Sequence, residues 1–130
     1  MAKVPVISIV DDDESVREAT KGLVRSLGYV AATFASSEEF LNSDLLNDTS
    51  CLITDVQMPG LNGLELQSRL IAMGRRIPVI FVTAFPQEQV RLRALKAGAI
   101  GFLNKPYSDD SLIVCLDRAI AGGDRNDAEQ

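Results

Sequence analysis

The stretch VISIVDDDE, residues 6–14, decides the fold class, because an apolar β-branched run ends abruptly in four acids. The run predicts a buried strand, and Asp13 is placed to cap a helix that follows it. Working outward along the chain, similar apolar runs recur at residues 29–34, 51–54, 79–82 and 100–103. We therefore expect five buried strands.

Segments with helical periodicity separate these runs. Ser36 and Asn62 each precede a glutamate by three residues, which is the spacing of a helix capping box. Pro86 suits the first turn of a fourth helix, because proline lacks the N–H that is unpaired there anyway. The last helix is expected to begin near Ser108 and to end near Ala121.

Five strands alternating with five helices predict an α/β fold with a doubly wound, five-stranded parallel sheet. Sheets of this kind bind ligands beyond the carboxyl ends of their strands, at the point where strand order reverses. Residues 1–121 are expected to form this one domain. Residues 122–130 are polar and begin with two glycines, so we expect a tail or the start of a linker.

Composition excludes several classes of function. Of the 130 residues, 46% are hydrophobic, and the net charge of −5 repels nucleic acid, so no direct nucleic-acid contact is expected. No stretch approaches the ~18 apolar residues of a membrane span, and no signal peptide opens the chain, which favours a cytoplasmic protein. Cys51 and Cys115 lie in apolar runs and are expected to be reduced core residues. The absence of histidine excludes histidine-dependent nucleophiles and histidine-bound zinc.

The acids after the first strand exceed what helix capping requires. Carboxylates ~4 Å apart repel one another by about 1 kcal/mol in water and by about 4 kcal/mol at an effective dielectric of 20. A cation would relieve this repulsion, and oxygen ligands without histidine indicate Mg²⁺. Asp55 ends the third strand and should lie beside Asp11 and Asp12 if the first and third strands are neighbours.

Two further polar residues end strands at the same edge of the predicted sheet. Thr83 ends the fourth strand, and Lys105 follows the fifth. A hydroxyl donor and an ammonium group suit an anion bound over the carboxylates. The complete set suits phosphoryl transfer to a carboxylate.

Four motifs in combination resemble the receiver domain of two-component response regulators. They are VDDD at residues 10–13, DVQMPGLNG at 55–63, TA at 83–84 and KAGAIGFLNKP at 96–106. The resemblance extends from about Val6 to Ala121 and is strongest to receivers of the nitrogen-fixation regulator (FixJ) type. It implies a flavodoxin-like fold with strand order 2-1-3-4-5.

The same resemblance assigns roles to the acids. Asp55 would accept a phosphoryl group from a phosphohistidine on a partner sensor histidine kinase. Asp12 and Asp55 would ligate Mg²⁺ directly, together with the backbone carbonyl of Gln57, and Asp11 would assist directly or through water. The chain would catalyse only its own phosphorylation and dephosphorylation, as a signalling domain and not as an enzyme.

The resemblance also implies a switch. Lys105 would pair with the acids, through a loop in which the bond to Pro106 is cis, and Thr83 would bond a phosphoryl oxygen. The Thr83 loop and the fourth helix would then move, and Phe102 would rotate inward. The reshaped face of the fourth helix and fifth strand would then control one of two partners. One is a second copy of the chain, in a homodimer, and the other is a DNA-binding output domain absent from this chain, through which the receiver would regulate transcription.

Two other functions stay open. A Mg²⁺-dependent phosphatase or phosphotransferase of the haloacid-dehalogenase type would place its nucleophile on the first strand, in an Asp-x-Asp-x-Thr pattern that residues 11–15 match imperfectly. A phosphorylation-independent adaptor of the same architecture would need neither metal nor acceptor. A dinucleotide enzyme is not supported, because no Gly-x-Gly-x-x-Gly follows the first strand.

Overall fold

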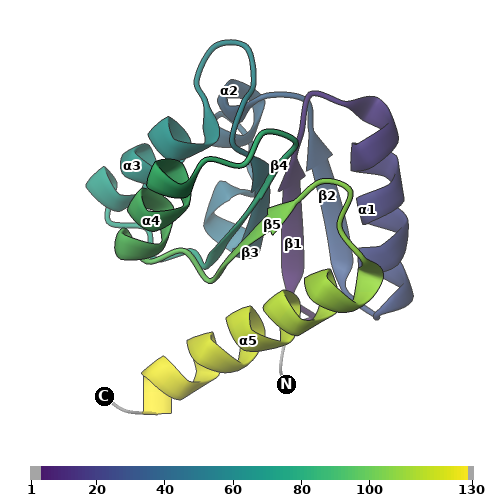
Figure 1. Cartoon of the computed structure of the whole chain (residues 1–130). Helices are drawn as coiled ribbons and strands as arrows, with labels where there is room; N and C mark the ends of the chain where they lie inside the picture. Colours follow the sequence, from purple (N-terminus) through teal and green to yellow (C-terminus); the bar gives the residue numbers. More distant parts are fainter. Residues whose placement is uncertain (1–3, 129–130) are drawn as a thin grey trace.

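The structure is a computed structural model that describes the backbone of residues 4–128 and the side chains of residues 4–122. Five parallel strands form one sheet in the order β2-β1-β3-β4-β5 (Figure 1). They are β1 (Val6–Val10), β2 (Val30–Phe34), β3 (Thr49–Asp55), β4 (Val79–Thr83) and β5 (Gly101–Asn104). The predicted doubly wound sheet and its strand order are confirmed.

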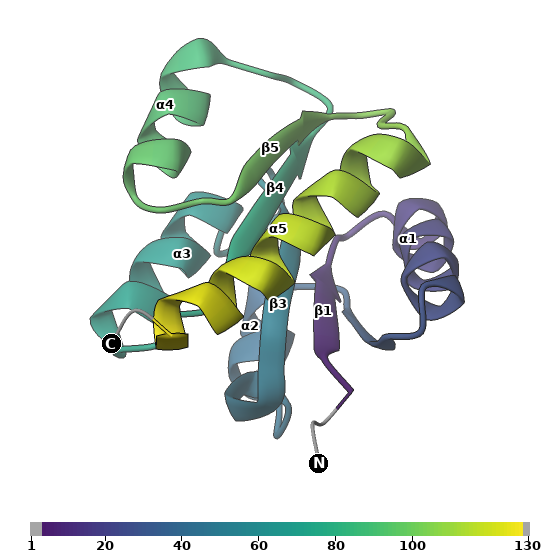
Figure 2. The same ribbon diagram turned by 90° about the horizontal axis from the view of Figure 1, so that it is seen from below.

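Helices cover both faces of the sheet (Figures 1 and 2). The five α-helices are α1 (Glu14–Ser26), α2 (Ser37–Leu41), α3 (Gly63–Ala72), α4 (Glu88–Lys96) and α5 (Asp109–Ala128). Residues of α1 and α5 pack together on one face, whereas residues of α2, α3 and α4 pack on the other. Burial on both faces explains why the strands read as continuous apolar runs.

The register of the central strands positions the carboxyl edge. Strand β1 pairs with β2 on one side and with β3 on the other, so strand order reverses between β1 and β3. Val10 lies opposite Thr54, so the residues that follow each of them, Asp11 and Asp55, emerge side by side. This is the edge at which sheets of this topology bind ligands.

The two cysteines lie in the core beneath α1 and α5. Both are free, and both are buried in the same hydrophobic cluster. Burial, reinforced by Cys115, raises the pKa of Cys51 to about 12, so this thiol is protonated at neutral pH. The prediction that both are core residues is confirmed.

Side chains cap the first three helices as predicted. The Asp13 carboxylate accepts hydrogen bonds from the backbone N–H groups of Ser15 and Val16, at 2.9 and 3.3 Å. Ser36 caps α2, and Asn62 forms a complete capping box with Glu65 at the start of α3.

The predicted place of Pro86 is wrong. Helix α4 begins at Glu88, and its N-cap is Gln87, so Pro86 precedes the helix. The Thr83 hydroxyl accepts a hydrogen bond from the Phe85 backbone N–H at 3.1 Å, and this turn extends the loop after β4. Proline also disfavours helical geometry in the residue before it, which keeps Phe85 out of the helix.

The predicted end of the last helix is also wrong. Helix α5 begins at Asp109, next to the expected Ser108, but it continues beyond Ala121 to Ala128. Gly122 and its neighbour weaken a helix by about 1 kcal/mol each without ending it, and no proline follows. Residues 129–130 of the predicted tail lie outside the described residues. Among the helices described, none is long and apolar enough to cross a membrane.

Candidate functional site

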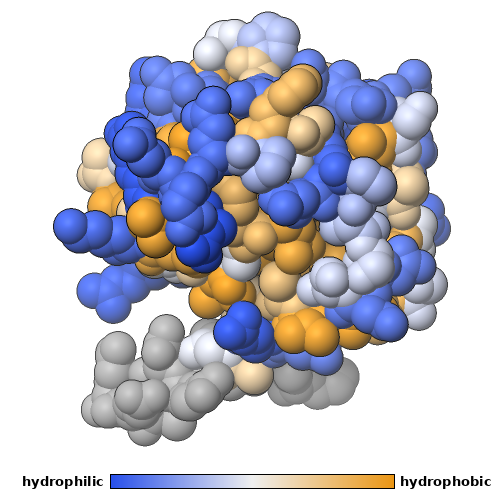
Figure 3. Space-filling view, in the orientation of Figure 1, coloured by the Kyte–Doolittle hydropathy of each residue, from blue (hydrophilic) through white to orange (hydrophobic). Residues whose placement is uncertain are grey.

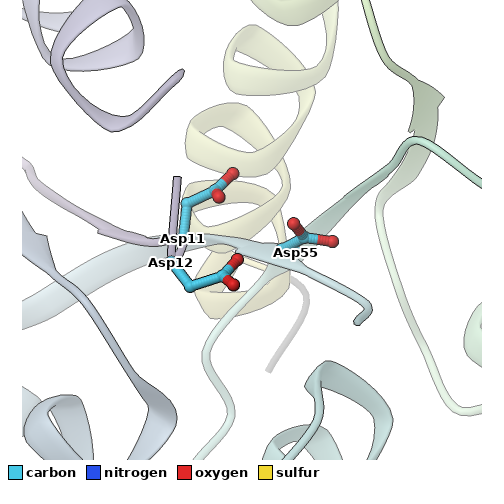
Figure 4. A group of neighbouring side chains, drawn as sticks. All are labelled: Asp11, Asp12 and Asp55. Atoms are coloured by element: carbon cyan, nitrogen blue, oxygen red, sulfur yellow. The ribbon is translucent and has the colours of Figure 1, made fainter. Parts of the chain in front are cut away.

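Three carboxylates meet at the carboxyl edge of the sheet (Figure 4). Asp11 and Asp12 directly follow β1, and Asp55 is the last residue of β3. One carboxylate oxygen from each residue lies within 4.8 Å of the other two. Asp11 and Asp55 are buried, whereas Asp12 is exposed. The strand order thus brings together the three acids that the sequence singled out.

Lys105, which directly follows β5, forms ion pairs with two of these acids. Its ammonium Nζ lies 2.8 Å from Asp55 Oδ2 and 2.9 Å from Asp11 Oδ2. Its backbone N–H donates to the carbonyl oxygen of Thr83 at 2.7 Å, which ties the end of β5 to the end of β4. The Lys105–Pro106 peptide bond is cis, as expected.

Burial and charge shift the pKa values of the paired groups. Burial raises the pKa of Asp11 above its usual 3.8, and this outweighs the hydrogen bond from the Asp13 N–H and the attraction of Lys105. For Lys105, burial acts to lower the pKa, but its bonds to Asp55 and Asp11 outweigh that effect and raise it. Lys105 therefore stays protonated at neutral pH. The ionised form of Asp11, in contrast, is destabilised by its burial in the folded domain.

The remaining predicted site residues lie on the same edge or directly beneath it. Thr83 is buried at the end of β4, and Gln57 is exposed, with its backbone N–H donating to Asp55 Oδ1 at 3.1 Å. Phe102 lies on β5, partly buried, with its ring centroid 6.2 Å from that of Phe81. Phe102 therefore lies on the face of the sheet that α4 covers.

The acidic cluster fits a magnesium ion. Mg²⁺ prefers oxygen ligands at about 2.1 Å in an octahedron, so opposite ligands lie ~4.2 Å apart. The carboxylate oxygens lie within 4.8 Å of one another, so small rotations of the side chains would bring them into this range. Asp11 Oδ2 is buried, and among the described residues the Lys105 ammonium, 2.9 Å away, is its charge partner. A buried carboxylate oxygen with a single such partner can still bind a hard cation.

A comparison with protein-family models decides the family. The model of the response regulator receiver domain matches residues 7–117. The chain belongs to this family. Receiver domains of response regulators are signalling domains that sensor histidine kinases phosphorylate, and they generally bind Mg²⁺ in an acidic pocket.

Known proteins similar to this receiver domain support the predicted likeness to FixJ. The chain is 39% identical to Nodulation protein W of Bradyrhizobium diazoefficiens over 121 residues, which cover 93% of this chain and 52% of that protein. It is 38% identical to the transcriptional regulatory protein FixJ of Azorhizobium caulinodans over 116 residues, 89% of this chain and 54% of that protein. The chain spans about half the length of these curated relatives.

A solved structure agrees with the same family. The structure of the response regulator StyR superposes with a TM-score of 0.88 at 38% sequence identity. The match covers 98% of this chain and 65% of that one. The predicted membership and fold are confirmed.

Two contacts around the receiver site were not predicted from the sequence. Arg17 Nη1 donates to the backbone carbonyl of Asp11 at 2.7 Å. The hydroxyls of Thr20 and Tyr107 lie 2.6 Å apart and join α1 to the loop between β5 and α5. Thr20 and Tyr107 are 87 positions apart in the chain, so no local pattern could have paired them.

We expect an Asp11→Asn substitution to stabilise the domain at neutral pH. Because the pKa of Asp11 is raised by folding, its ionised form opposes folding above that pKa. An amide removes this cost, so the free energy of unfolding should rise at pH 7. The gain should shrink as pH falls from the raised pKa toward the ordinary value of 3.8, and it should vanish below that value, where Asp11 is protonated in both states. Urea unfolding at several pH values measures this.

Magnesium provides the control for that prediction. Excess Mg²⁺ should stabilise the wild-type domain more than the Asp11→Asn variant, because a ligand that binds only the folded state adds its binding free energy to stability. An equal Mg²⁺ effect on both proteins would show that Asp11 takes no part in holding the ion.

Proposed function

We propose that this chain is the phosphoacceptor switch of a two-component response regulator, with Asp55 as the residue that accepts the phosphoryl group from a phosphohistidine of a sensor histidine kinase. One observation carries the proposal. The Asp55 carboxylate lies at the switch point of the sheet, within 4.8 Å of two other carboxylates and 2.8 Å from the Lys105 ammonium. Family membership supports it independently.

The transfer requires a nucleophile and charge stabilisation. An oxygen of Asp55 attacks phosphorus, the new O–P bond forms, and the P–N bond to the donor imidazole breaks. The electron pair of that bond stays on the imidazole nitrogen, which takes a proton from solvent. Lys105 supplies positive charge to the transferred oxygens, since its ammonium already lies beside Asp55.

We propose that Thr83 binds a phosphoryl oxygen once the group is on Asp55. Its hydroxyl oxygen accepts from the Phe85 N–H, and within the described side chains its own proton has no acceptor. That O–H can therefore donate to a phosphoryl oxygen. Asp11, Asp12, Asp55 and the Gln57 carbonyl would hold Mg²⁺, which when bound offsets the charge of the carboxylates and of the phosphoryl oxygens.

The output follows from the added charge. A phosphoryl group brings about −1.5 to −2 charge and three acceptor oxygens to the site. We propose that Thr83 moves toward it, that Phe102 then rotates inward, and that the face of α4 and β5 changes shape. Apolar residues already gather over β5 on this face, between hydrophilic regions (Figure 3). Leu92 on α4 and Val114 on α5 are both more than half exposed.

That face is our proposed partner surface. It would support a homodimer on phosphorylation, or contact a DNA-binding output portion, and so control transcription. The likeness to the transcriptional regulatory protein FixJ supports contact with a DNA-binding output portion, because the match covers only about half of the length of FixJ. We propose that the receiver acts in the cytoplasm and makes no nucleic-acid contact of its own, given its net charge of −5.

A small donor with a P–N bond tests the proposal without the partner kinase. Phosphoramidate and Mg²⁺ should add a single phosphoryl group to the chain, visible in its intact mass, stable to acid and labile to base. Omitting Mg²⁺ should prevent the addition. If the chain binds neither Mg²⁺ nor phosphoryl groups, the proposal is wrong and the phosphorylation-independent adaptor replaces it.

A further inference from the structure

The loop between β5 and α5 carries one side-chain hydrogen bond to α1 among the residues that the structure describes. Tyr107 Oη lies 2.6 Å from Thr20 Oγ1. Thr20 is only 4% exposed, and the Tyr107 ring packs against the core cluster of α1 and α5. A partly buried pair of hydroxyls this close holds the two segments together.

This loop also carries Lys105, two residues before Tyr107. The Lys105 ammonium lies 2.9 Å from Asp11 Oδ2, directly after β1, and 2.8 Å from Asp55 Oδ2, at the end of β3. On one side, its backbone is fixed by the 2.7 Å bond to Thr83. After Lys105, the loop residues Pro106 and Ser108 are exposed. The hydrogen bond of the loop to α1 is therefore the one that the Tyr107 hydroxyl forms with Thr20.

Helix α1 is in turn fixed to the acids. Arg17 donates to the Asp11 carbonyl at 2.7 Å, and Thr20 lies one turn further along the same face of the helix. A closed set of contacts therefore runs from Asp11 through Arg17, α1, Thr20 and Tyr107 to Lys105, and back to Asp11 through the ion pair.

We propose that Tyr107 is a positioning residue for phosphorylation of Asp55. Its hydroxyl, bonded to Thr20, holds the loop against α1 and keeps the Lys105 ammonium between Asp11 and Asp55. This inference rests on the proposed function. Tyr107 does not touch the reacting atoms and acts only through Lys105.

Substitutions that remove only the bond test this. Tyr107→Phe and Thr20→Val keep the shape of each side chain, whereas Thr20→Ser keeps the hydroxyl and is the matched control. With acetyl phosphate as donor, kinase docking plays no part. The initial rate of phosphorylation should fall about tenfold in the first two variants, because small misplacements of a catalytic group have effects of this size or larger. Thr20→Ser should stay within about twofold of wild type.

The Lys105→Ala background separates positioning from general damage. If Tyr107 acts only through Lys105, adding Tyr107→Phe to Lys105→Ala changes the rate no further. A tenfold loss on adding Tyr107→Phe both to the wild type and to Lys105→Ala would overturn the proposal. A general structural effect would lower the rate by the same factor whether or not Lys105 is present. A wild-type rate in Tyr107→Phe would overturn it as well.

A second measurement does not depend on phosphorylation, so failure of the proposed function stays distinguishable. Hydrogen exchange of the Lys105 amide reports the bond to Thr83. Tyr107→Phe should speed that exchange by about tenfold while amides in β1 and β3 keep their rates, since only the loop is loosened. Unchanged exchange at Lys105 would show that the tyrosine does not hold the loop.

Discussion

The Asp55→Asn variant is expected to take up no phosphoryl group from any donor. Asparagine matches aspartate in size, and its oxygen can still accept from the Gln57 N–H. The amide lacks the negative charge of a nucleophile, however, and loss of a nucleophile lowers rates at least about a thousandfold. Lys105 keeps Asp11 as a partner at 2.9 Å, so the fold should survive. Intact mass after treatment with acetyl phosphate and Mg²⁺ measures the result.

Asp44→Asn is the matched control for this prediction. Asp44 is exposed, forms no ion pair among the described side chains, and lies outside the acidic cluster. The control should be phosphorylated like the wild type and should have the same stability. Continued Mg²⁺-dependent labelling of Asp55→Asn would mean that another residue is the acceptor.

Of the variants proposed for this protein, Gly63→Ala should lose the most free energy of unfolding. Gly63 begins α3 directly behind the site, and its N–H donates to the Val56 carbonyl at 2.8 Å. A Cβ at this position would overlap the backbone carbonyl of Asp55 and would lie 3.0 Å from Val56 Cα and 3.1 Å from a ring carbon of Phe81. Backbone atoms cannot move aside as a flexible side chain can, so we expect a loss of about 3 kcal/mol or more.

Gly22→Ala gives the matched comparison, measured by urea unfolding of both variants. Gly22 lies within α1, and a Cβ there meets nothing within 4 Å. Alanine should raise the free energy of unfolding by about 0.5–1 kcal/mol, because it reduces the freedom of the unfolded chain and favours helix. Gly63→Ala should also slow phosphorylation, since it displaces Asp55. Wild-type stability in Gly63→Ala would contradict the close approach of α3 to β3.

The acidic site was predictable from the sequence once a strand order was assumed. Alternating strands and helices predict the parallel sheet, and the resemblance to receiver domains implies the order 2-1-3-4-5, which sets the ends of the first and third strands side by side. Asp11 and Asp55 must then meet, and the register of β1 and β3 shows that they do. The long separation in sequence does not matter, because each acid ends a strand that periodicity identifies by itself.

Other features depended on contacts that periodicity does not encode. The bond between Thr20 and Tyr107 and the tight fit of Gly63 behind Asp55 both follow from how α1 and α3 dock on the sheet. The start of α4 at Pro86 and the end of α5 at Ala121 were predicted wrongly because helix ends depend on local contacts. The hydrogen bond from the Phe85 N–H to the Thr83 hydroxyl forms a turn before α4. Helix α5 continues through Gly122, although glycine is typical of helix ends.

The most direct test of the central claim is to locate the phosphoryl group on the chain. Sodium borohydride reduces an aspartyl phosphate to homoserine, which tandem mass spectrometry then places in the sequence. After treatment with acetyl phosphate and Mg²⁺, we predict homoserine at position 55 and at no other aspartate. Homoserine at position 11, the place of the nucleophile in a phosphatase of the haloacid-dehalogenase type, would contradict the account.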